Sequence, residues 1–410
     1  VKGEGTLTAR SLDNKSIAVW VYNGVLTIEK ATLNAYGTWG LAGNDAKNGA
    51  LVLKNARVQA RGRECAMGNF NVFTQEGCHI IEPQDGKWDG DKHAIVSGNE
   101  KAKRVWIVRE GESPKLYGFS IAGVDITSEN ITALDKIPGV TVPADGELKY
   151  DPETKTLSMK NVTMRLNDES LKGGNAIDNK SLSDLKIDVQ GKNEITTKDA
   201  DCFQFHTTTS IKGTGELTLK AEGNNSAIHI PRTDLTIADI TLSLNGVFGV
   251  VGTDNQGALN IQNATVTTDC SQSAFKAMNT FNLTLCRISE PEGANWNSSS
   301  HQVFAGSAIV KKMKIEPFLG FYIAGTPVTS QNVGQLNGIS GVTVAADGEL
   351  TYASKTKTLT MKNVTITDLD RKIALHNELL DGFTIEIAGT NNFSTKDADC
   401  LRFDKATTIT

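Results

Sequence analysis

The sequence predicts an all-β protein made of parallel β-helix units in tandem, each fronted by a β-hairpin cap. Two repeats lead to this fold class: a long one of about 200 residues and, inside it, a short one of about 24 residues. Composition agrees, because 39% hydrophobic and only 6% aromatic residues, with abundant Asn, Thr and Gly, suit short strands joined by tight turns.

The long repeat divides the chain into one complete unit and parts of two others. The segment GVTVPADGELKY from Gly139 returns as GVTVAADGELTY from Gly341, 202 residues later. Near the other end of the unit, Trp88 returns as Trp296, 208 residues later. We therefore predict the C-terminal part of a first unit in 1–114, a complete unit with its N-terminal cap in 115–316, and the N-terminal part of a third unit in 317–410.

The short repeat predicts a buried apolar column. In a parallel β-helix each coil stacks on the last, so equivalent positions line up in the core. The expected column in the complete unit is Ile187, Ile211, Ile237, Ile261 and Leu285. The third unit is expected to continue the same pattern with Met361, Ile385 and Ile409, and a second apolar row runs through Ile177, Phe203, Ile228, Val251 and Phe275.

Competing folds explain the short period less well. A leucine-rich repeat needs an LxxLxLxxN pattern and a helical segment, and the sequence has neither. An antiparallel sandwich has strands at similar spacing but no reason to repeat one residue class every turn.

The front of each unit differs from its rungs. The segment GELKYDPETKTLSM predicts a hairpin with a four-residue turn at Asp151–Thr154. A short helix is expected from Ser128 to near Pro138. We interpret this section as a cap, since an open β-helix end exposes unpaired backbone.

These motifs resemble a repeat of bacterial surface proteins of the Bacteroidetes and Firmicutes type. The motifs are IAGTPVTSQN from Ile323, DGELTYASKTKTLTMKNVTI after it, and rungs with LTI and LNI. The rung portion, with KDADCFQFHTTTSIKGTGELTL from Lys198, is similar to the carbohydrate-binding, pectate-lyase-like right-handed β-helix family. The resemblance implies a right-handed β-helix, an extracellular or cell-surface location, and binding of a polysaccharide or surface glycan.

Aromatic residues are the candidate carbohydrate-binding residues. Trp20 and Tyr22 alternate along a strand, so they share one face and are the preferred glycan contact. Trp88 and Trp296 either form sugar-stacking platforms or cover the apolar end of the last rung, and the covering role is favoured. Trp39 is expected in the core.

Two acidic turns are the candidate metal site. Asp199 and Asp201 recur as Asp397 and Asp399, and alternate residues of an extended segment point the same way. Paired carboxylates suit Ca²⁺, although Ca²⁺ needs six to eight oxygen ligands. The favoured alternative is a ladder of polar side chains that bind turn backbone.

The six cysteines show neither a zinc spacing nor a disulfide framework. Cys202 and Cys400 fall in a row of small residues, which favours buried apolar side chains over reactive thiols. Local disulfides Cys65–Cys78 and Cys270–Cys286 remain alternatives.

Several function classes are excluded. A net charge of −5 with interspersed signs argues against nucleic-acid binding, and no apolar run is long enough to span a membrane. No motif of hydrolytic or nucleophilic catalysis is present. We expect a non-catalytic carbohydrate-binding surface protein. The alternatives are a structural adhesin, stalk or filament-forming repeat without a small ligand and, behind it, a uronate-specific polysaccharide lyase.

The two termini fall at the same point of the repeat, since Val1 and Ile409 both align with Ile211. We expect both ends to lie at open rung edges. The chain is then either a piece of a longer array or able to associate head-to-tail with another copy.

Overall fold

The computed structural model describes the chain apart from residues 12–15, 45 and 167–173. Its regular structure is β-strand, with two short 3-10 helices at Leu134–Lys136 and Val333–Gly338. The strands stack in parallel coils, so the predicted all-β class and β-solenoid architecture are confirmed. The described residues form two compact parts, one centred on Val1–Tyr117 and one on Ile131–Arg165 and Gly173–Thr410. Unit 1 denotes the first repeat as far as residue 114, unit 2 is the complete unit at 115–316, and the third unit is 317–410.

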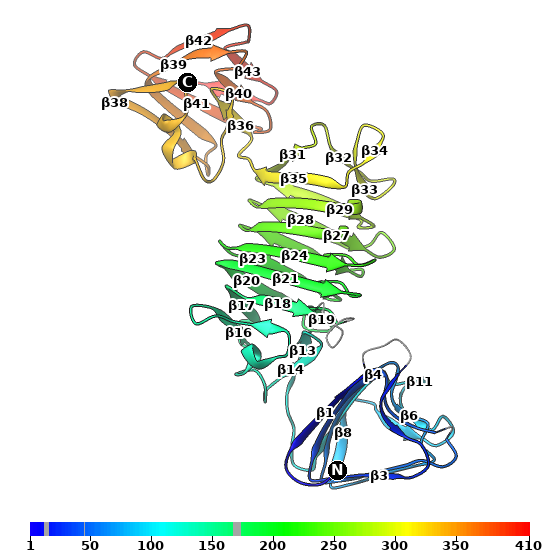
Figure 1. The fold of residues 1–410 in the computed structure, drawn as a ribbon. Helices are drawn as coiled ribbons and strands as arrows, with labels where there is room; N and C mark the ends of the chain where they lie inside the picture. The colour runs from blue at the N-terminus through cyan, green and yellow to red at the C-terminus, as the bar shows by residue number, and fades with distance from the viewer. Residues whose placement is uncertain (12–15, 45, 167–173) are drawn as a thin grey trace. The chain divides into compact units, whose positions relative to one another are not determined.

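Each coil of unit 2 contributes strands to three faces (Figure 1). The first face is a sheet in the order β16-β17-β20-β23-β26-β28-β30, parallel from β17 onward. The bounds are β16 Glu147–Asp151, β17 Thr156–Lys160, β20 Leu185–Gln190, β23 Thr209–Lys212, β26 Leu235–Ala238, β28 Ala258–Gln262 and β30 Thr280–Thr284.

The other two faces join into one sheet because two long strands, β27 and β29, bend around a corner and serve both. Their register shifts between Gly246 and Phe248 at that corner. The second face contains β18 Thr163–Leu166, β21 Lys192–Lys198 and β24 Glu216–Glu222; the third contains β19 Ile177–Asn179, β22 Phe203–Phe205 and β25 Ile228–Ile230; the shared strands are β27 Thr241–Gly252 and β29 Thr265–Lys276.

Unit 1 has the same three faces, and Figure 1 views it along its axis, where they outline a triangle. One face is the parallel sheet β3-β5-β7, and the long strands β4 and β6 again serve the other two. The bounds are β1 Thr6–Arg10, β2 Ile17–Val21, β3 Val25–Glu29, β4 Thr32–Gly43, β5 Ala50–Lys54, β6 Arg57–Gly68 and β7 Val72–Glu76.

The predicted core column is confirmed at four of its five positions. Ile187, Ile211, Ile237 and Ile261 pair in register, and each is buried. The fifth position is wrong, because Ile261 pairs with Leu283 and not Leu285. Leu285 follows the end of β30, where its φ of 53° takes the chain out of the strand and leaves it 44% exposed.

Two other residues that the sequence assigned to apolar rows also lie elsewhere, because the number of residues per rung varies slightly. In the third unit Ile385 and Ile409 stack on Leu359, so Met361 belongs to the next column, with Ile387. In the second row Ile228 pairs with Val250, and Val251 faces outward beside His229.

Asparagine holds the corners between faces. Asn161 and Asn363 adopt left-handed φ values of 54° and 52°. Their Oδ1 atoms accept hydrogen bonds from the N–H groups of Lys192, at 3.0 Å, and Thr390, at 2.9 Å, on the next rung. A Cβ atom at Gly191 would lie 2.1 Å from Asn161 Oδ1, so only glycine fits there.

The N-terminal cap of the complete unit contains the predicted hairpin. Strands β16 and β17 pair antiparallel around the turn, and Asp151 Oδ1 accepts a hydrogen bond from the N–H of Glu153 at 2.9 Å. The expected helix is only the 3-10 turn Leu134–Lys136, starting later than Ser128. The other cap strands are β13 Leu116–Ile121, β14 Val124–Thr127 and β15 Val140–Thr141.

The same cap recurs in the third unit, where β38 and β39 form the hairpin and β39 pairs in parallel with β41. The strands of this part are β36 Phe321–Ile323, β37 Thr326–Pro327, β38 Val342–Ala353, β39 Thr358–Asp370, β40 Leu375–Asn377, β41 Phe383–Ala388, β42 Asn392–Lys396, β43 Leu401–Phe403 and β44 Thr407–Ile409.

Unit 1 and the complete unit each end in a C-terminal cap of antiparallel strands, which the sequence patterns did not predict. In unit 1, β12 pairs antiparallel with β6 and β8; in unit 2, β35 pairs likewise with β29 and β31. The strands are β8 Cys78–Glu82, β9 Lys87–Asp89, β10 Ala94–Ser97, β11 Glu100–Lys101, β12 Arg104–Arg109, β31 Cys286–Glu290, β32 Asn295–Asn297, β33 Gln302–Ala305, β34 Ala308–Ile309 and β35 Lys312–Pro317.

The column makes a stability prediction. Ile237→Asp places a charge in a fully buried position, and we expect it to lower the free energy of unfolding by about 4 kcal/mol or more. Thr236→Asp is the matched control, because Thr236 is the neighbouring, half-buried residue of the same strand. Urea denaturation measures both, and an equal loss in the two variants would contradict the stacked-column interpretation.

Candidate functional site

Trp20 and Tyr22 form an exposed aromatic pair on unit 1. Strand β2 pairs with β4, and its Val19 and Val21 pack against the core while Trp20 points away from it. Trp20 is 56% exposed and Tyr22 is 59% exposed. Their ring centroids lie 5.2 Å apart with planes at 87°, so the two rings meet edge to face. The expected exposure of the pair is therefore confirmed.

In unit 2 the position equivalent to Trp20 is occupied by His229. Trp20 pairs with Ala42, next to the last residue of β4, and His229 pairs with Val251, next to the last residue of β27. His229 Nδ1 lies 3.4 Å from Asp201 Oδ2, and its Nε2 lies 3.1 Å from Thr253 Oγ1. The aromatic pair is thus a departure of unit 1 from the repeat.

Trp88 lies in the C-terminal cap of unit 1. Its ring stacks on Phe73 of the last rung, with centroids 5.1 Å apart and an interplanar angle of 29°, and it packs against the core cluster. A hollow of about 360 Å³ opens beside it, lined by Phe73, Gln75, Ile80, Gly86, Lys87 and Trp88. Trp88 therefore both covers the last rung and lines an accessible surface.

Trp296 occupies the equivalent place in unit 2 but is packed differently. Its ring meets Phe281 of the last rung at 5.8 Å and His301 at 6.4 Å. Its Nε1 is buried without a hydrogen-bond partner among the described residues. This packing favours the covering role for Trp296.

Trp39, expected in the core, is half-buried on the surface instead. Its Nε1 donates a hydrogen bond to Glu64 at 2.8 Å, and Lys101 Nζ lies 5.1 Å from its ring centroid. The residue follows the corner of β4, where the register shift turns the side chain outward.

The acidic turns have a repeated local structure. Asp199 and Asp397 adopt left-handed φ values of 60° and 56°. The threonine two residues before each, Thr197 or Thr395, donates a hydrogen bond from its hydroxyl to the carbonyl of the alanine that follows the aspartate, at 2.8 and 2.7 Å. The TKDADC sequence is therefore explained as a corner turn.

The second aspartate of the turn binds the next rung. Asp201 Oδ1 accepts a hydrogen bond from the N–H of Ser226 at 2.7 Å, and Ser226 is buried. Asp399 has the equivalent place in the third unit and is exposed. Within the described ranges no group of three or more His, Cys, Asp or Glu side chains is arranged to hold a metal ion. Calcium binding at Asp199, Asp201, Asp397 and Asp399 stays a prediction.

Aspartate–histidine pairs line the third face, and sequence reasoning missed them. Asp178 Oδ1 lies 3.8 Å from His206 Nε2. In the third unit the two residues are exchanged: His376 Nε2 lies 2.7 Å from Asp404 Oδ2. The hydrogen bond from His376 and a second one from Arg402 lower the pKa of Asp404. The repeat offset of 198 residues relates both pairs, so an alignment of the units shows the exchange.

All six cysteines are free, so neither local disulfide is present. Cys202 is fully buried, and burial raises its pKa to about 12; Cys65 and Cys270 are raised by burial to about 11 and about 12. The structure supports the packing role that the sequence favoured.

The part of the chain that the structure describes contains no helix with the length and apolar character needed to cross a membrane. Searches of protein-family models, curated proteins and solved structures found no match to this chain.

A mutation experiment distinguishes the two roles considered for the acidic turn, calcium binding and hydrogen bonding to the backbone of the next rung. Asp201→Ala leaves the buried N–H of Ser226 unpaired, so we expect a loss of about 1–2 kcal/mol in unfolding free energy. Asp399→Ala, the exposed equivalent, should change it by less than about 0.5 kcal/mol. Calorimetry at millimolar Ca²⁺ should show at most weak binding, and clear binding abolished by Asp199→Ala or Asp201→Ala would contradict the ladder interpretation.

Thiol reactivity gives a second prediction. With a pKa of about 12, only roughly one Cys202 side chain in 10⁴ is a thiolate at pH 8, and its burial blocks access. Ellman's reagent should therefore label Cys202 in urea but not in the native protein. The half-buried Cys400 should react first, and rapid native labelling of Cys202 would contradict this packing.

Proposed function

We propose that this protein binds carbohydrate without catalysing its cleavage, and that Trp20 and Tyr22 are its main glycan contact. The observation that carries the proposal is the exposure of two large aromatic side chains that meet edge to face, one near the end of strand β2 and one directly after it. Aromatic rings bury large apolar areas on binding, and such exposed anchors dominate recognition surfaces. The C–H face of a sugar ring is a suitable partner for an indole ring.

The departure of unit 1 from the repeat supports this choice. A strand of the solenoid needs apolar residues on its inner side only, and in unit 2 the outward position is polar His229. Trp20 and Tyr22 therefore add nothing to the core, and exposing them costs hydrophobic free energy. Binding a ligand explains why they are there.

An extracellular or cell-surface location is part of the proposal. It rests on the resemblance of the IAGTPVTSQN and DGELTYASKTKTLTMKNVTI segments to bacterial surface repeats. The right-handed sense of the coils rests on the same resemblance.

A structural role as a stalk or adhesin repeat is the second candidate, favoured by the caps. The complete unit has a hairpin cap at its front and antiparallel strands at its end. Modules closed in this way suit a tandem array.

Head-to-tail association belongs to this second candidate. The outer edge of β44 has no partner among the described strands, and Ile409 is 49% exposed there. The outer edge of β3 is only partly covered, by the hydrogen bonds of Val1 and Gly3 to Thr27 and Glu29, and Val25 at its start is 66% exposed. Either continuing sequence or a second copy would cover such edges. Sedimentation over a range of concentrations tests the self-association.

The aromatic pair gives the main prediction. Trp20→Ala combined with Tyr22→Ala should weaken binding to any glycan found on an array by at least about tenfold, because the stacking surface is removed. Leu285→Ala is the matched control, since Leu285 is exposed but lies outside the pair. Unchanged affinity in the double variant, with its melting temperature intact, would contradict the proposal.

The absence of catalysis is tested separately. Incubation with pectin, polygalacturonate and common plant and host glycans should release neither unsaturated uronide absorbance nor new reducing ends. Either product, formed in proportion to the protein added, would replace binding by lyase or hydrolase activity.

A further inference from the structure

The hollow beside Trp88 differs from its equivalent in unit 2 at the positions that carry polar groups. Both caps place a tryptophan over a phenylalanine of the last rung, Trp88 over Phe73 and Trp296 over Phe281. Lys87, next to Trp88, corresponds to Asn295. The aromatic framework is shared, and the cation is found in unit 1.

Gln75 is the second difference, and it breaks the core column. In unit 1, Leu53 pairs with Gln75, whereas in unit 2 the equivalent Ile261 pairs with Leu283. An apolar side chain at this last position would extend the buried column, so an amide there gives up apolar packing. Polar residues that break a local packing rule are expected at functional sites.

Lys87 is available to a ligand. Its side chain is exposed and forms no direct ion pair with a described residue, and its charge acts on the carboxylates of Asp85 and Asp89 only as a smaller contribution to their lowered pKa values. The neighbouring carboxylates of Asp85 and Asp89 already accept hydrogen bonds from the cap. Asp85 accepts hydrogen bonds from Ser97 Oγ at 2.7 Å and from the N–H of Gly98 at 2.8 Å. Asp89 Oδ1 accepts two more from the backbone N–H groups of Asp91 and Lys92, each at 2.9 Å.

These two aspartates hold the cap rather than line the hollow. The hydrogen bonds from Ser97 and from the Lys92 backbone lower the pKa values of Asp85 and Asp89, respectively. The hydrogen bonds that Asp85 and Asp89 accept fix the turns on either side of β9, the strand that carries Lys87 and Trp88. The lining itself contains one charged side chain, the Lys87 ammonium, and that group only donates hydrogen bonds.

We propose that this hollow is a second carbohydrate subsite, selective for a sugar unit that carries a carboxylate or a sulfate. The sugar ring lies against Phe73 and Trp88, its anionic group meets Lys87, and Gln75 hydrogen-bonds a hydroxyl. A volume of about 360 Å³ is at the small end of ligand pockets and suits a single sugar ring. The inference rests on the proposed carbohydrate-binding function but uses different residues from the Trp20–Tyr22 pair.

The test uses pairs of probes with the same sugar residues, one carrying an anionic group and one neutral at that position. Trigalacturonate is compared with its methyl ester, and a 6-sulfated galactotriose with galactotriose, by calorimetry on the full chain. The wild type should bind at least one charged probe about tenfold more tightly than its neutral counterpart, because a hydrogen bond to a charged group contributes more than a neutral one. Which charged probe binds distinguishes carboxylate from sulfate recognition.

Two of the variants replace a residue of unit 1 by its unit 2 equivalent, and a third, Lys87→Arg, keeps the charge. Lys87→Asn should abolish the preference for the charged probe, and Lys87→Arg should keep it. Gln75→Leu should weaken charged and neutral probes alike while raising the melting temperature, because leucine continues the column above Leu53. Asn and Leu already occupy these positions in unit 2, Asn295 in its cap and Leu283 in its last rung, so loss of binding in Lys87→Asn or Gln75→Leu is not a consequence of misfolding.

The outcomes separate this subsite from the main proposal. Loss of charge preference in Lys87→Asn, with glycan-array binding through Trp20 and Tyr22 retained, supports the subsite. A wild type that binds array glycans through Trp20 and Tyr22 but shows no charge preference overturns the subsite and leaves the proposed function standing. Charge preference that survives Lys87→Asn also overturns it.

Discussion

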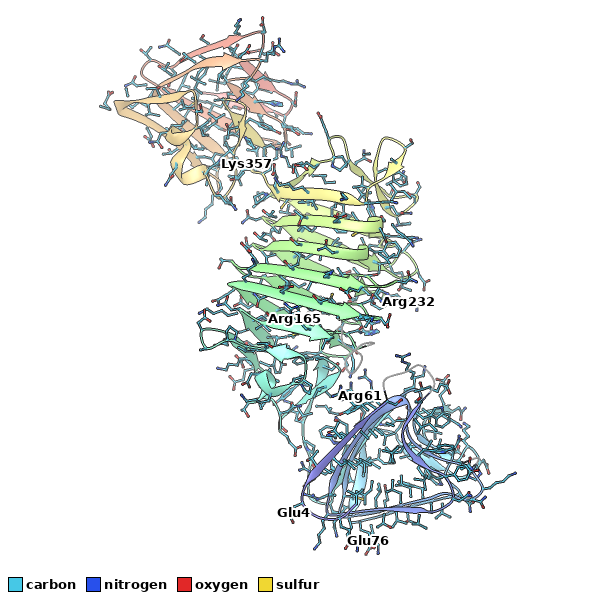
Figure 2. All side chains as sticks on the ribbon, viewed as in Figure 1. Glu4, Arg61, Glu76, Arg165, Arg232 and Lys357 are labelled. Atoms are coloured by element: carbon cyan, nitrogen blue, oxygen red, sulfur yellow. The ribbon has the colours of Figure 1, made fainter. Side chains whose placement is uncertain are left out.

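Parallel stacking of one coil on the next is the constraint on which the structure depends. Each strand finds its hydrogen-bond partners in the coils before and after it, so a residue's neighbours are its own equivalents about 24 positions away. The core is therefore a set of columns of buried apolar side chains, and a polar or differently sized residue in a column disturbs its neighbours on both sides. The same constraint sets the corners, where Asn161 and Asn363 reach across to the next rung and Gly191 and Gly389 leave them room. Stacking does not restrict the residue type at outward-facing positions. Arg165 and Arg232, which Figure 2 labels on the complete unit, lie exposed on the outside of its coils.

Function is therefore best sought where one unit departs from another. The exposed Trp20 stands where unit 2 has His229, and Gln75 and Lys87 stand where it has Leu283 and Asn295. None of these replacements is required by stacking. The exchanged Asp178–His206 and His376–Asp404 pairs are a different kind of departure, because the interaction is kept while its partners are swapped. That pattern indicates a structural pair on the third face rather than a site peculiar to one unit.

The sequence was informative wherever periodicity reports directly on packing. It identified the column from Ile187 to Ile261, the hairpin at Asp151–Thr154 and the exposed pair Trp20 and Tyr22, because each depends on spacing within one or two strands. It was wrong at Leu285 and Met361, because a rung can lengthen or shorten at a corner, and apolar residues two positions apart are equally plausible members of a column. The C-terminal caps and the hollow at Trp88 were not predictable, since they arise from antiparallel strands that have no counterpart in the short repeat.

The two caps of the complete unit bear on how such a protein changes over evolutionary time. A solenoid without internal caps gains or loses coils only by re-forming one continuous core, and every insertion must match the register of its neighbours. Here the hairpin at β16–β17 and the strands β31 and β35 close the central unit at both ends. A duplication or deletion of one whole unit would consequently join cap to cap and leave every core column intact. The number of units, and with it the length of the array, can then be altered by recombination between the identical DGEL segments.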